Sequence, residues 1–303
     1  MKMPIVSVHN MSVQFGDFYA VRDVSFDVAR GEIFGFLGAN GAGKTTTIRV
    51  LCGLLPATDG RVVIDGIEFH PRYANDIKRR VGYMSQRFTL YDDLSVAENF
   101  EFAASLRGLG HDEYVARQNI LLDFIGFNRT LKAIVKNLPG GIKQEVALCV
   151  ALLHDPSIIF LDEPTAGVAS HARMRFWNLI HELVRAGKTI FVTTHYMDEA
   201  ENCSRIALMR AGELIAIDSP ENLKRKTFGD TLYSMRAKSK KPMLPVPDAV
   251  DIWQPYGSGF HLRFRDGIDV ASHLRQLKRD WYIEQIRPSL EDVFIKLVEG
   301  QNR

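Results

Sequence analysis

The chain has 303 residues, of which 46% are hydrophobic and 24% charged, and its formal net charge is +2. This composition is ordinary for a soluble globular protein and excludes a collagen-like or wholly disordered chain. No apolar run approaches the roughly 18–20 residues that a membrane-spanning helix needs, and the start of the chain lacks the apolar region of a secretion signal. We therefore expect a cytoplasmic protein of about two domains, with three reduced, buried cysteines, Cys52, Cys149 and Cys203.

The first predicted elements are strands around a tight turn, followed by a short helix. Ile5–Val8 and Val24–Val28 are rich in β-branched residues, and the Gly-Asp pair at residues 16–17 suits a hairpin turn between them. The apolar run Glu32–Leu37 predicts a buried strand, and Thr45–Leu51 can begin a helix. A glycine-rich loop therefore lies between a buried strand and a helix.

This loop, at residues 38–45, carries the strongest chemical signal in the chain. It matches the phosphate-binding pattern G-x-x-x-x-G-K-[ST] in the required context. Glycines let backbone N–H groups approach phosphate oxygens, and the next helix adds the positive end of its dipole. Lys44 would contact the β- and γ-phosphates, and Thr45 would offer a hydroxyl to Mg²⁺. The alternative is a glycine-rich turn without a ligand. The residues that we expect to contact ATP are Gly38, Ala39, Asn40, Gly41, Ala42, Gly43, Lys44, Thr45 and Thr46.

Two acidic residues follow a later buried strand. Residues 87–155 show the spacing of amphipathic helices, whereas Ser157–Leu161 and Thr189–Thr193 are apolar strands separated by a helix, an order that predicts a parallel sheet. Asp162 would hold Mg²⁺, and Glu163 would act as general base toward the attacking water. Two acids at a strand end can also be plain turn residues, but the phosphate loop upstream favours the catalytic interpretation.

His195 follows the second of these strands. This places it at the carboxyl edge of the predicted sheet, where open α/β sheets bind their ligands. It could donate a hydrogen bond to the γ-phosphate of ATP, and the alternative is a purely structural histidine.

The composition changes near residue 220, and residues 221–303 predict a small α+β domain. They hold 15 Lys and Arg against 11 Asp and Glu, an excess too small to indicate nucleic-acid binding. Ser239–Pro247, with three prolines, is typical of a linker. A half-buried strand is predicted beyond it, because Phe260, Leu262 and Phe264 alternate with the polar residues His261, Arg263 and Arg265. Ser289, with Asp292 three residues later, resembles a helix start.

The order of these motifs resembles the nucleotide-binding domain of ABC transporters. Besides the phosphate loop, the resemblance includes Gly82–Gln86, Leu138–Gln144, Phe160–Glu163 and Thr194–Glu201. It covers about residues 5–220. It implies an α/β fold of the P-loop NTPase class, with an ABC-type ATPase domain at residues 4–220 that has a mixed sheet, an antiparallel β subdomain and a helical subdomain at about 87–155. Pro288–Phe294 resembles the extension of daunorubicin-resistance-type drug exporters, which implies an accessory or regulatory domain at 221–303.

The resemblance also implies roles for single residues. Phe15 occupies the position of the aromatic that stacks on adenine, although a core position in the hairpin is the alternative. Gln86 would link Mg²⁺ and the attacking water to the transmembrane partner. Gly140 and Gly141 would approach the ATP bound by the other subunit of a head-to-tail dimer. The expected catalytic residues are then Glu163, His195 and Lys44, and the expected metal-binding residues are Thr45, Gln86 and Asp162.

Two positions depart from the family pattern. Pro139 stands where the family usually has a serine, and Ala169 stands where it usually has an aspartate. Proline offers neither a hydroxyl nor an N–H group to a γ-phosphate. We therefore expect the residues that bind this chain's own ATP to be intact, and those lent to the opposing site to be impaired.

Two functions of different classes fit these motifs. The first is the ATPase subunit of an exporter of drug-like or lipid-like substrates, at the cytoplasmic face of the inner membrane, with a separate integral-membrane permease and a second nucleotide-binding domain. The alternative is an ABC-type ATPase that acts on ribosomes or DNA. Such proteins usually carry two cassettes, long coiled-coil insertions or zinc-binding cysteines, which the chain lacks. We therefore favour the exporter subunit.

Overall fold

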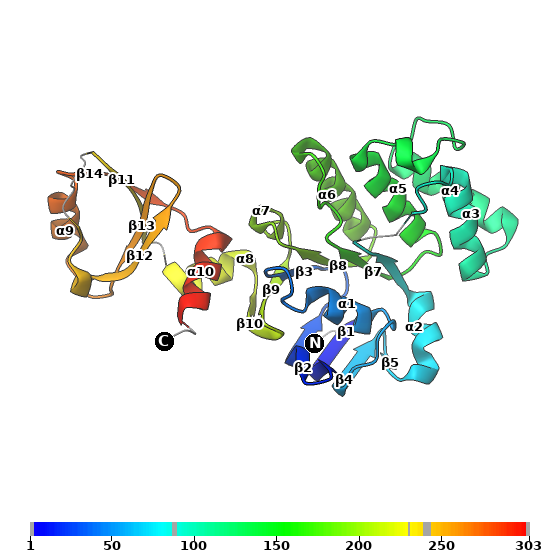
Figure 1. Cartoon of the computed structure of the whole chain (residues 1–303), viewed down its shortest axis with the longest axis horizontal. Helices are drawn as coiled ribbons and strands as arrows, with labels where there is room; N and C mark the ends of the chain where they lie inside the picture. The colour runs from blue at the N-terminus through cyan, green and yellow to red at the C-terminus, as the bar shows by residue number, and fades with distance from the viewer. Residues whose placement is uncertain (1–2, 87–89, 230, 239–243, 301–303) are drawn as a thin grey trace. The chain divides into compact units, whose positions relative to one another are not determined.

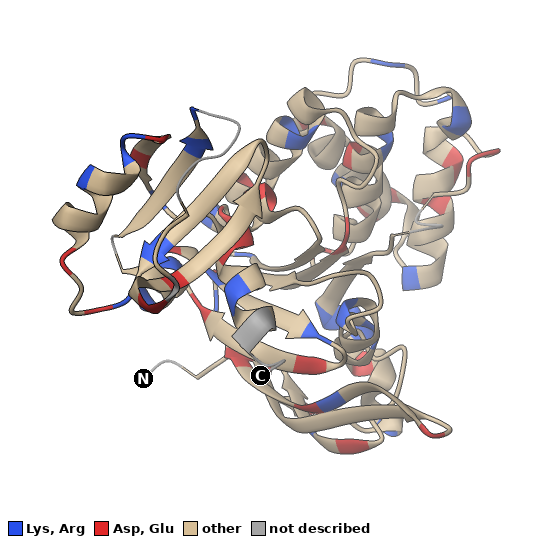
Figure 2. Ribbon diagram, turned by 60° about the vertical axis from the view of Figure 1, so that its left-hand side comes forward, with Lys and Arg blue, Asp and Glu red and all other residues tan. Residues whose placement is uncertain are grey.

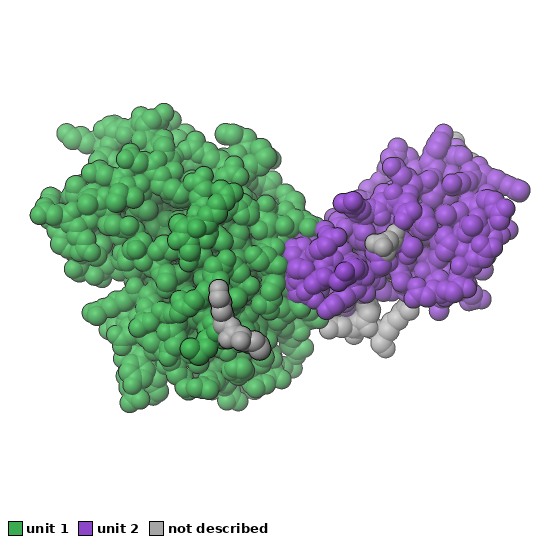
Figure 3. All heavy atoms as spheres, turned by 180° about the vertical axis from the view of Figure 1, so that it is seen from behind, with its two compact units in different colours: residues 1–217 green, residues 218–303 purple. Residues whose placement is uncertain are grey.

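The computed structural model describes residues 3–86, 90–229, 231–238 and 244–300, and the chain divides into two compact units, residues 1–217 and 218–303 (Figure 3). Each unit has its own cluster of buried apolar side chains. Residues 87–89 of the predicted helical segment and 239–243 of the predicted linker lie outside the described residues. Both signs of charge are distributed over each unit (Figure 2).

An antiparallel sheet forms one part of the first unit. Its strands, in spatial order, are β2 (Phe18–Val28), β1 (Val6–Phe15), β4 (Asp59–Ile64) and β5 (Ile67–Glu68). A turn at residues 16–17 joins β1 to β2, as the Gly-Asp pair predicts, and Val6 pairs with Val28 at the far end of the hairpin. Alternate residues of both strands are buried, which is the pattern of a sheet with one covered face.

A second, six-stranded sheet forms the centre of the first unit. Its strands, in spatial order, are β10 (Glu213–Asp218), β9 (Arg205–Arg210), β3 (Ile33–Leu37), β8 (Thr189–Thr194), β7 (Ile158–Asp162) and β6 (Val81–Met84). The pairings from β9 to β6 are parallel, which confirms the parallel sheet predicted from the sequence. Strands β3 and β7 are buried on both faces. The carboxyl ends of parallel strands lie at one edge of a sheet, and this edge is where such sheets bind ligands.

The helices of the first unit lie against this sheet or beside it (Figure 1). They are α1 (Lys44–Leu51), α2 (Ala74–Arg80), α3 (Val96–Arg107), α4 (His111–Phe124), α5 (Gly140–Leu152), α6 (Ser170–Arg185) and α7 (Met197–Ala200), with short 3-10 helices at Pro71–Tyr73 and Val135–Asn137. Helices α3, α4 and α5 pack on one another as a helical group. Helix α3 begins with a capping box, in which Ser95 and Glu98 bond each other's backbone N–H groups. Within the described residues, every helix is too short or too polar to cross a bilayer.

The second unit is an antiparallel sheet with helices. Its strands lie in the order β12 (Val250–Tyr256), β13 (Gly259–Phe264), β11 (Leu232–Ala237) and β14 (Trp281–Ile286), and its helices are α8 (Pro220–Phe228), α9 (Val270–Leu277) and α10 (Leu290–Gly300), with a 3-10 helix at Pro247–Ala249. The alternation along β13 wrongly places His261 among the exposed side chains. This residue is 5% exposed, because its Nδ1 lies 2.6 Å from Oδ1 of Asp292 on α10, a partner that the strand pattern does not reveal.

The three cysteines have the environment that the sequence predicts. All three are free thiols and buried. Burial raises their thiol pKa values, so they stay protonated and unreactive at neutral pH.

Candidate active site

The phosphate loop connects β3 to α1 and depends on its glycines. Gly41 and Gly43 have φ values of +79° and +105°, which L side chains rarely adopt. A Cβ atom at Gly38 would lie 2.3 Å from the carbonyl oxygen of Met209, and one at Gly43 would lie 2.5 Å from that of Ala20. The surrounding backbone therefore excludes any side chain at both ends of the loop, whereas residues 39–41 are exposed and accessible to a ligand.

Lys44 lies buried beneath this loop. It is 4% exposed, and its Nζ donates hydrogen bonds to the carbonyl oxygens of Gly38, at 2.8 Å, and Ala39, at 3.1 Å. Burial lowers the pKa of Lys44, and the carboxylate of Glu163, 3.6 Å from Nζ, opposes that shift. One carboxylate at this distance and two carbonyl oxygens balance the buried positive charge of Lys44 only in part. This side chain is thus well suited to a phosphate group.

Asp162, at the end of β7, has one oxygen in use and one free. Its Oδ1 accepts hydrogen bonds from the hydroxyls of Thr193, at 2.7 Å, and Thr45, at 3.1 Å. Its Oδ2 is buried and has no hydrogen-bond partner among the described residues. Burial raises the pKa of this carboxyl group. A buried orphan oxygen beside a threonine hydroxyl has the chemistry of a site for a hard cation such as Mg²⁺.

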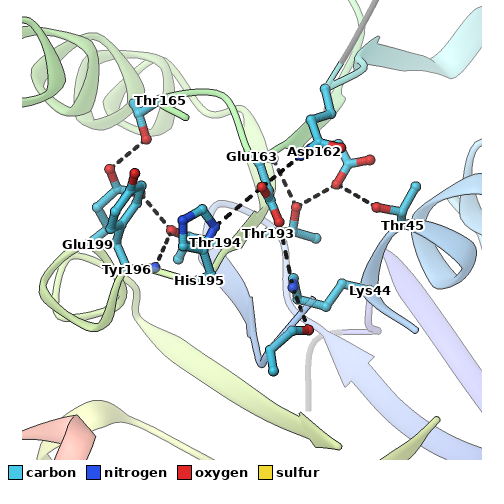
Figure 4. Close-up of polar contacts among 12 residues, drawn as sticks. Lys44, Thr45, Asp162, Glu163, Thr165, Thr193, Thr194, His195, Tyr196 and Glu199 are labelled. Carbon is cyan, nitrogen blue, oxygen red and sulfur yellow. Dashed lines mark hydrogen bonds and ion pairs between the residues drawn. The ribbon is translucent and has the colours of Figure 1, made fainter. Parts of the chain in front are cut away.

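Glu163 lies at the centre of the site, between Lys44 and His195 (Figure 4). One carboxylate oxygen, Oε2, accepts a hydrogen bond from Nε2 of Gln86 at 2.8 Å and lies 3.3 Å from Nδ1 of His195. The backbone of Glu163 has a φ of +48°, an uncommon value for a residue other than glycine. Its N–H donates to the hydroxyl of Thr193 at 2.9 Å. The fold thus brings Lys44, Gln86, Glu163 and His195 together.

The adenine-stacking candidate lies at the end of a strand. Phe15 is the last residue of β1, and 52% of its surface is exposed. The alternative of a core phenylalanine in the hairpin is therefore wrong. An exposed ring remains free to stack on a base.

The paired glycines, Gly140 and Gly141, begin α5 and differ in how closely other atoms approach them. A Cβ atom at Gly140 would meet nothing within 4 Å, but one at Gly141 would lie 2.7 Å from Cβ of Ala172 on α6. Gly141 is therefore required by packing within this chain, whatever it contacts in a second subunit. Pro139 and Ala169 are the N-cap residues of α5 and α6, and neither forms a side-chain cap.

The structure shows contacts among these segments that the sequence motifs do not reveal. The hydroxyls of Thr165 and Thr194 both donate hydrogen bonds to the carboxylate of Glu199 on α7. Glu199 is 3% exposed. Its place four residues after His195 is a signal in the sequence, but its partner Thr165 lies on a different loop.

Comparison with known proteins agrees with this geometry. Residues 21–166 match the family described as ABC transporter. The chain is 41% identical over 229 residues to the probable multidrug ABC transporter ATP-binding protein YbhF of Escherichia coli, covering 75% of this chain and 39% of that protein. It is 32% identical over 305 residues to the Nod factor export ATP-binding protein I of Cupriavidus metallidurans, covering 99% of both chains.

A solved structure is similar as well. It is the dimeric, post-hydrolysis state of the ATP-binding cassette MJ0796 bound to ADP and Pi, with a TM-score of 0.64 and 27% identity. The similarity covers 71% of this chain and 98% of that cassette.

Proposed function

Since this chain belongs to the ABC transporter family as an ATP-binding cassette, we propose that it hydrolyses ATP to power the export of drug-like or lipid-like substrates through a separate membrane permease. The observation that carries the ATPase function is the convergence of Lys44, Thr45, Asp162, Gln86, Glu163 and His195 at one edge of the central sheet. The names of two relatives, a probable multidrug protein and a Nod factor export protein, support export. They offer no support for action on ribosomes or DNA.

Each side chain at this edge has a distinct task in the proposed reaction. Lys44 offsets the negative charge of the β- and γ-phosphates, and the loop from Gly38 to Thr46 contacts them through backbone N–H groups. Glu163 orients the attacking water and takes its proton. His195 donates a hydrogen bond to the γ-phosphate, and Phe15 stacks on adenine.

Mg²⁺ would be held by Thr45, Asp162 and Gln86. The orphan Oδ2 of Asp162 and the adjacent hydroxyl of Thr45 fit such an ion. When bound, Mg²⁺ supplies neutralisation of phosphate charge. The hydroxyls of Thr45 and Thr193 bond only Oδ1 of Asp162, and Oδ2 has no hydrogen-bond partner among the described residues, so it would be available to the ion.

The partners that we propose are a membrane permease and a second nucleotide-binding domain. The dimeric state of the similar cassette supports a dimer. In a head-to-tail arrangement, Gly140 and Gly141 would face the ATP of the opposing chain. The chain would then act at the cytoplasmic face of the inner membrane, with residues 218–303 as an accessory unit.

Copurification and turnover test this function together. The chain would be purified in mild detergent from the cells that naturally produce it, and the ATPase rate and the copurified molecules would be measured. We expect the permease and Mg²⁺-dependent ATP hydrolysis. Copurification of RNA without any membrane protein would contradict export. Absence of turnover in the chain with its permease would contradict the ATPase assignment.

A further inference from the structure

We propose that Glu199 is a positioning residue for ATP hydrolysis, because its buried carboxylate ties the loop after Glu163 to the turn that carries His195. This inference rests on the proposed function, since it concerns the same reaction. It assigns a task to a residue outside the phosphate loop and the strand-end acids. Glu199 acts on the reacting groups only through two threonines.

The carboxylate of Glu199 bridges two segments that are far apart in the chain. Thr165 donates a hydrogen bond through its hydroxyl to Oε1 at 2.5 Å, and Thr194 donates one to Oε2 at 2.8 Å (Figure 4). Arg173 of α6 places Nη1 3.7 Å from Oε1 and so offsets the charge. The side chain of Glu199 is only 4% exposed. The burial of this carboxylate is thus matched by two hydrogen bonds and an ion pair, as a buried acidic group requires.

Both threonines stand directly beside the residues of the proposed reaction. Thr194 precedes His195, and its hydroxyl also accepts a hydrogen bond from the N–H of Tyr196 at 3.0 Å. The rings of His195 and Tyr196 lie 4.1 Å apart between centroids, and the guanidinium of Arg173 lies 4.6 Å from the centroid of the Tyr196 ring. The backbone on either side of His195 is therefore held through Thr194.

On the other loop, Thr165 lies two residues after Glu163. Glu163 adopts a φ of +48°, and such a conformation persists only when neighbouring contacts hold it. Thr193 bonds its N–H on one side, and the N–H of Ala166 donates to its carbonyl oxygen at 3.2 Å on the other. Glu199 fixes Thr165 within this turn. It thereby sets the position of Glu163 relative to His195, which contacts Oε2 at 3.3 Å.

The competing interpretation is that Glu199 merely stabilises the fold. A stabilising residue would, when removed, lower the melting temperature and reduce nucleotide affinity and turnover together. A positioning residue would lower kcat while nucleotide affinity stays, because the phosphate loop and Lys44 are held by separate contacts to Gly38 and Ala39. Misplacement of a reacting group by about 1 Å can cost about 100-fold in rate.

The test uses the full chain with its permease and compares Glu199→Ala, Glu199→Gln and the control Glu182→Ala. Glu182 is an exposed glutamate on α6. We expect kcat to fall about 10- to 100-fold in Glu199→Ala, with the Kd of a non-hydrolysable ATP analogue within about threefold of the parent. The glutamine, which keeps one acceptor oxygen, should recover most of the rate, and the control should be unchanged.

Hydrogen exchange gives a readout that needs no turnover. In Glu199→Ala we expect faster amide exchange in residues 163–168 and 194–197, and no change in β7 or α1. If the alanine variant does not fold, Thr165→Val and Thr194→Val replace it, and each should lower kcat at unchanged affinity. Because both hydroxyls act through one carboxylate, the double valine variant should lose less than the two single losses combined.

Three results would overturn the inference. The first is an unchanged kcat in Glu199→Ala, or in both valine variants. The second is a fall in kcat that is accompanied by a comparable fall in nucleotide affinity and by a lower melting temperature. The third is unchanged exchange in both loops. Absence of turnover in the parent chain would contradict the proposed function instead, and hydrogen exchange alone would then decide the question of Glu199.

Discussion

Replacing Glu163 with glutamine tests the proposed general base with the least disturbance of shape. The carboxylate is buried and has three cationic or N–H-bearing neighbours: Nε2 of Gln86 at 2.8 Å, Nδ1 of His195 at 3.3 Å and Nζ of Lys44 at 3.6 Å. An amide oxygen can still accept the hydrogen bond from Gln86, but an amide cannot take a proton from water. We expect kcat to fall about 10²- to 10⁴-fold, which corresponds to about 3–5 kcal/mol of barrier.

Nucleotide binding should survive this change. Lys44 keeps its bonds to the carbonyl oxygens of Gly38 and Ala39, at 2.8 and 3.1 Å, so the loop stays in place. The Kd of ATP should remain within about threefold of the parent at neutral pH. Glu163 raises the pKa of Lys44 against the lowering effect of burial. Without that carboxylate the pKa of Lys44 falls further. As the pH is raised, Lys44 should therefore lose its charge at a lower pH in the variant than in the parent, and ATP affinity should fall with it.

Phosphate release measures turnover, titration calorimetry measures binding, and gel filtration measures the dimer. The variant should hold an ATP-bound dimer longer than the parent, because hydrolysis no longer opens it. Glu182→Gln, which makes the same substitution at an exposed glutamate on α6, is the matched control and should turn over normally. If Glu163→Gln retained turnover within about threefold of the parent, another group would have to be the base.

The remaining predictions concern other parts of the chain. Lys44→Ala should weaken ATP binding about 10- to 100-fold, since a hydrogen bond to a charged group contributes about 1.5–3 kcal/mol; unchanged affinity by calorimetry would refute the phosphate-loop assignment. The double variant Pro139→Ser with Ala169→Asp should raise the ATPase rate of the chain alone if the opposing-site contacts are impaired. Both positions are N-caps, so the melting temperature must be followed as a control, because a new cap alone contributes about 1 kcal/mol. If the double variant is no faster, the two departures are neutral. A fragment of residues 1–217 should still bind ATP, because these residues form a compact unit; a well-folded fragment without ATP binding would contradict this. Burial lowers the pKa of His154 to about 4, so the folded state binds fewer protons than the unfolded state between that pH and about 6.5. The free energy of unfolding should therefore fall on acidification, and His154 should account for about 2 kcal/mol of that fall at pH 5. Between pH 7.5 and pH 5, the free energy of unfolding measured in urea should fall less in His154→Gln than in the parent. An equal loss of stability in the parent and the variant would show that His154 does not contribute to this pH dependence.

Local sequence patterns determined several strands, turns and loop conformations of this protein. The requirement for glycine at residues 38 and 43 follows from the phosphate-loop pattern, and the structure shows backbone carbonyls where a Cβ would stand. Asp162 and Glu163 could be placed because an apolar run of strand length ends at them, and the parallel order of the strands could be predicted from the intervening helix. Such features depend on neighbours in the chain, so a short window of sequence contains them.

The pairing of residues across the sheet was decided by the tertiary structure. Parallel register sets Asp162 against Thr193, two residues that are 31 apart in sequence, and their side chains share a hydrogen bond. Glu199, on α7, likewise joins Thr165 to Thr194, which lie 29 residues apart. Although Thr194 lies within a recognised motif, no local pattern shows which side chain each of these threonines contacts.

His261 shows the same limit in the second unit. Its strand alternates as a half-buried strand should, and the alternation by itself exposes the imidazole. Asp292, 31 residues later, instead forms a buried partner for it, and Gln254 donates to the same carboxylate oxygen at 3.1 Å. A polar side chain is buried when the fold supplies it with a partner, and that partner comes from whichever element packs against it. The sequence by itself therefore predicted which residues form the proposed site, whereas the packing of distant elements decided which of them are held together.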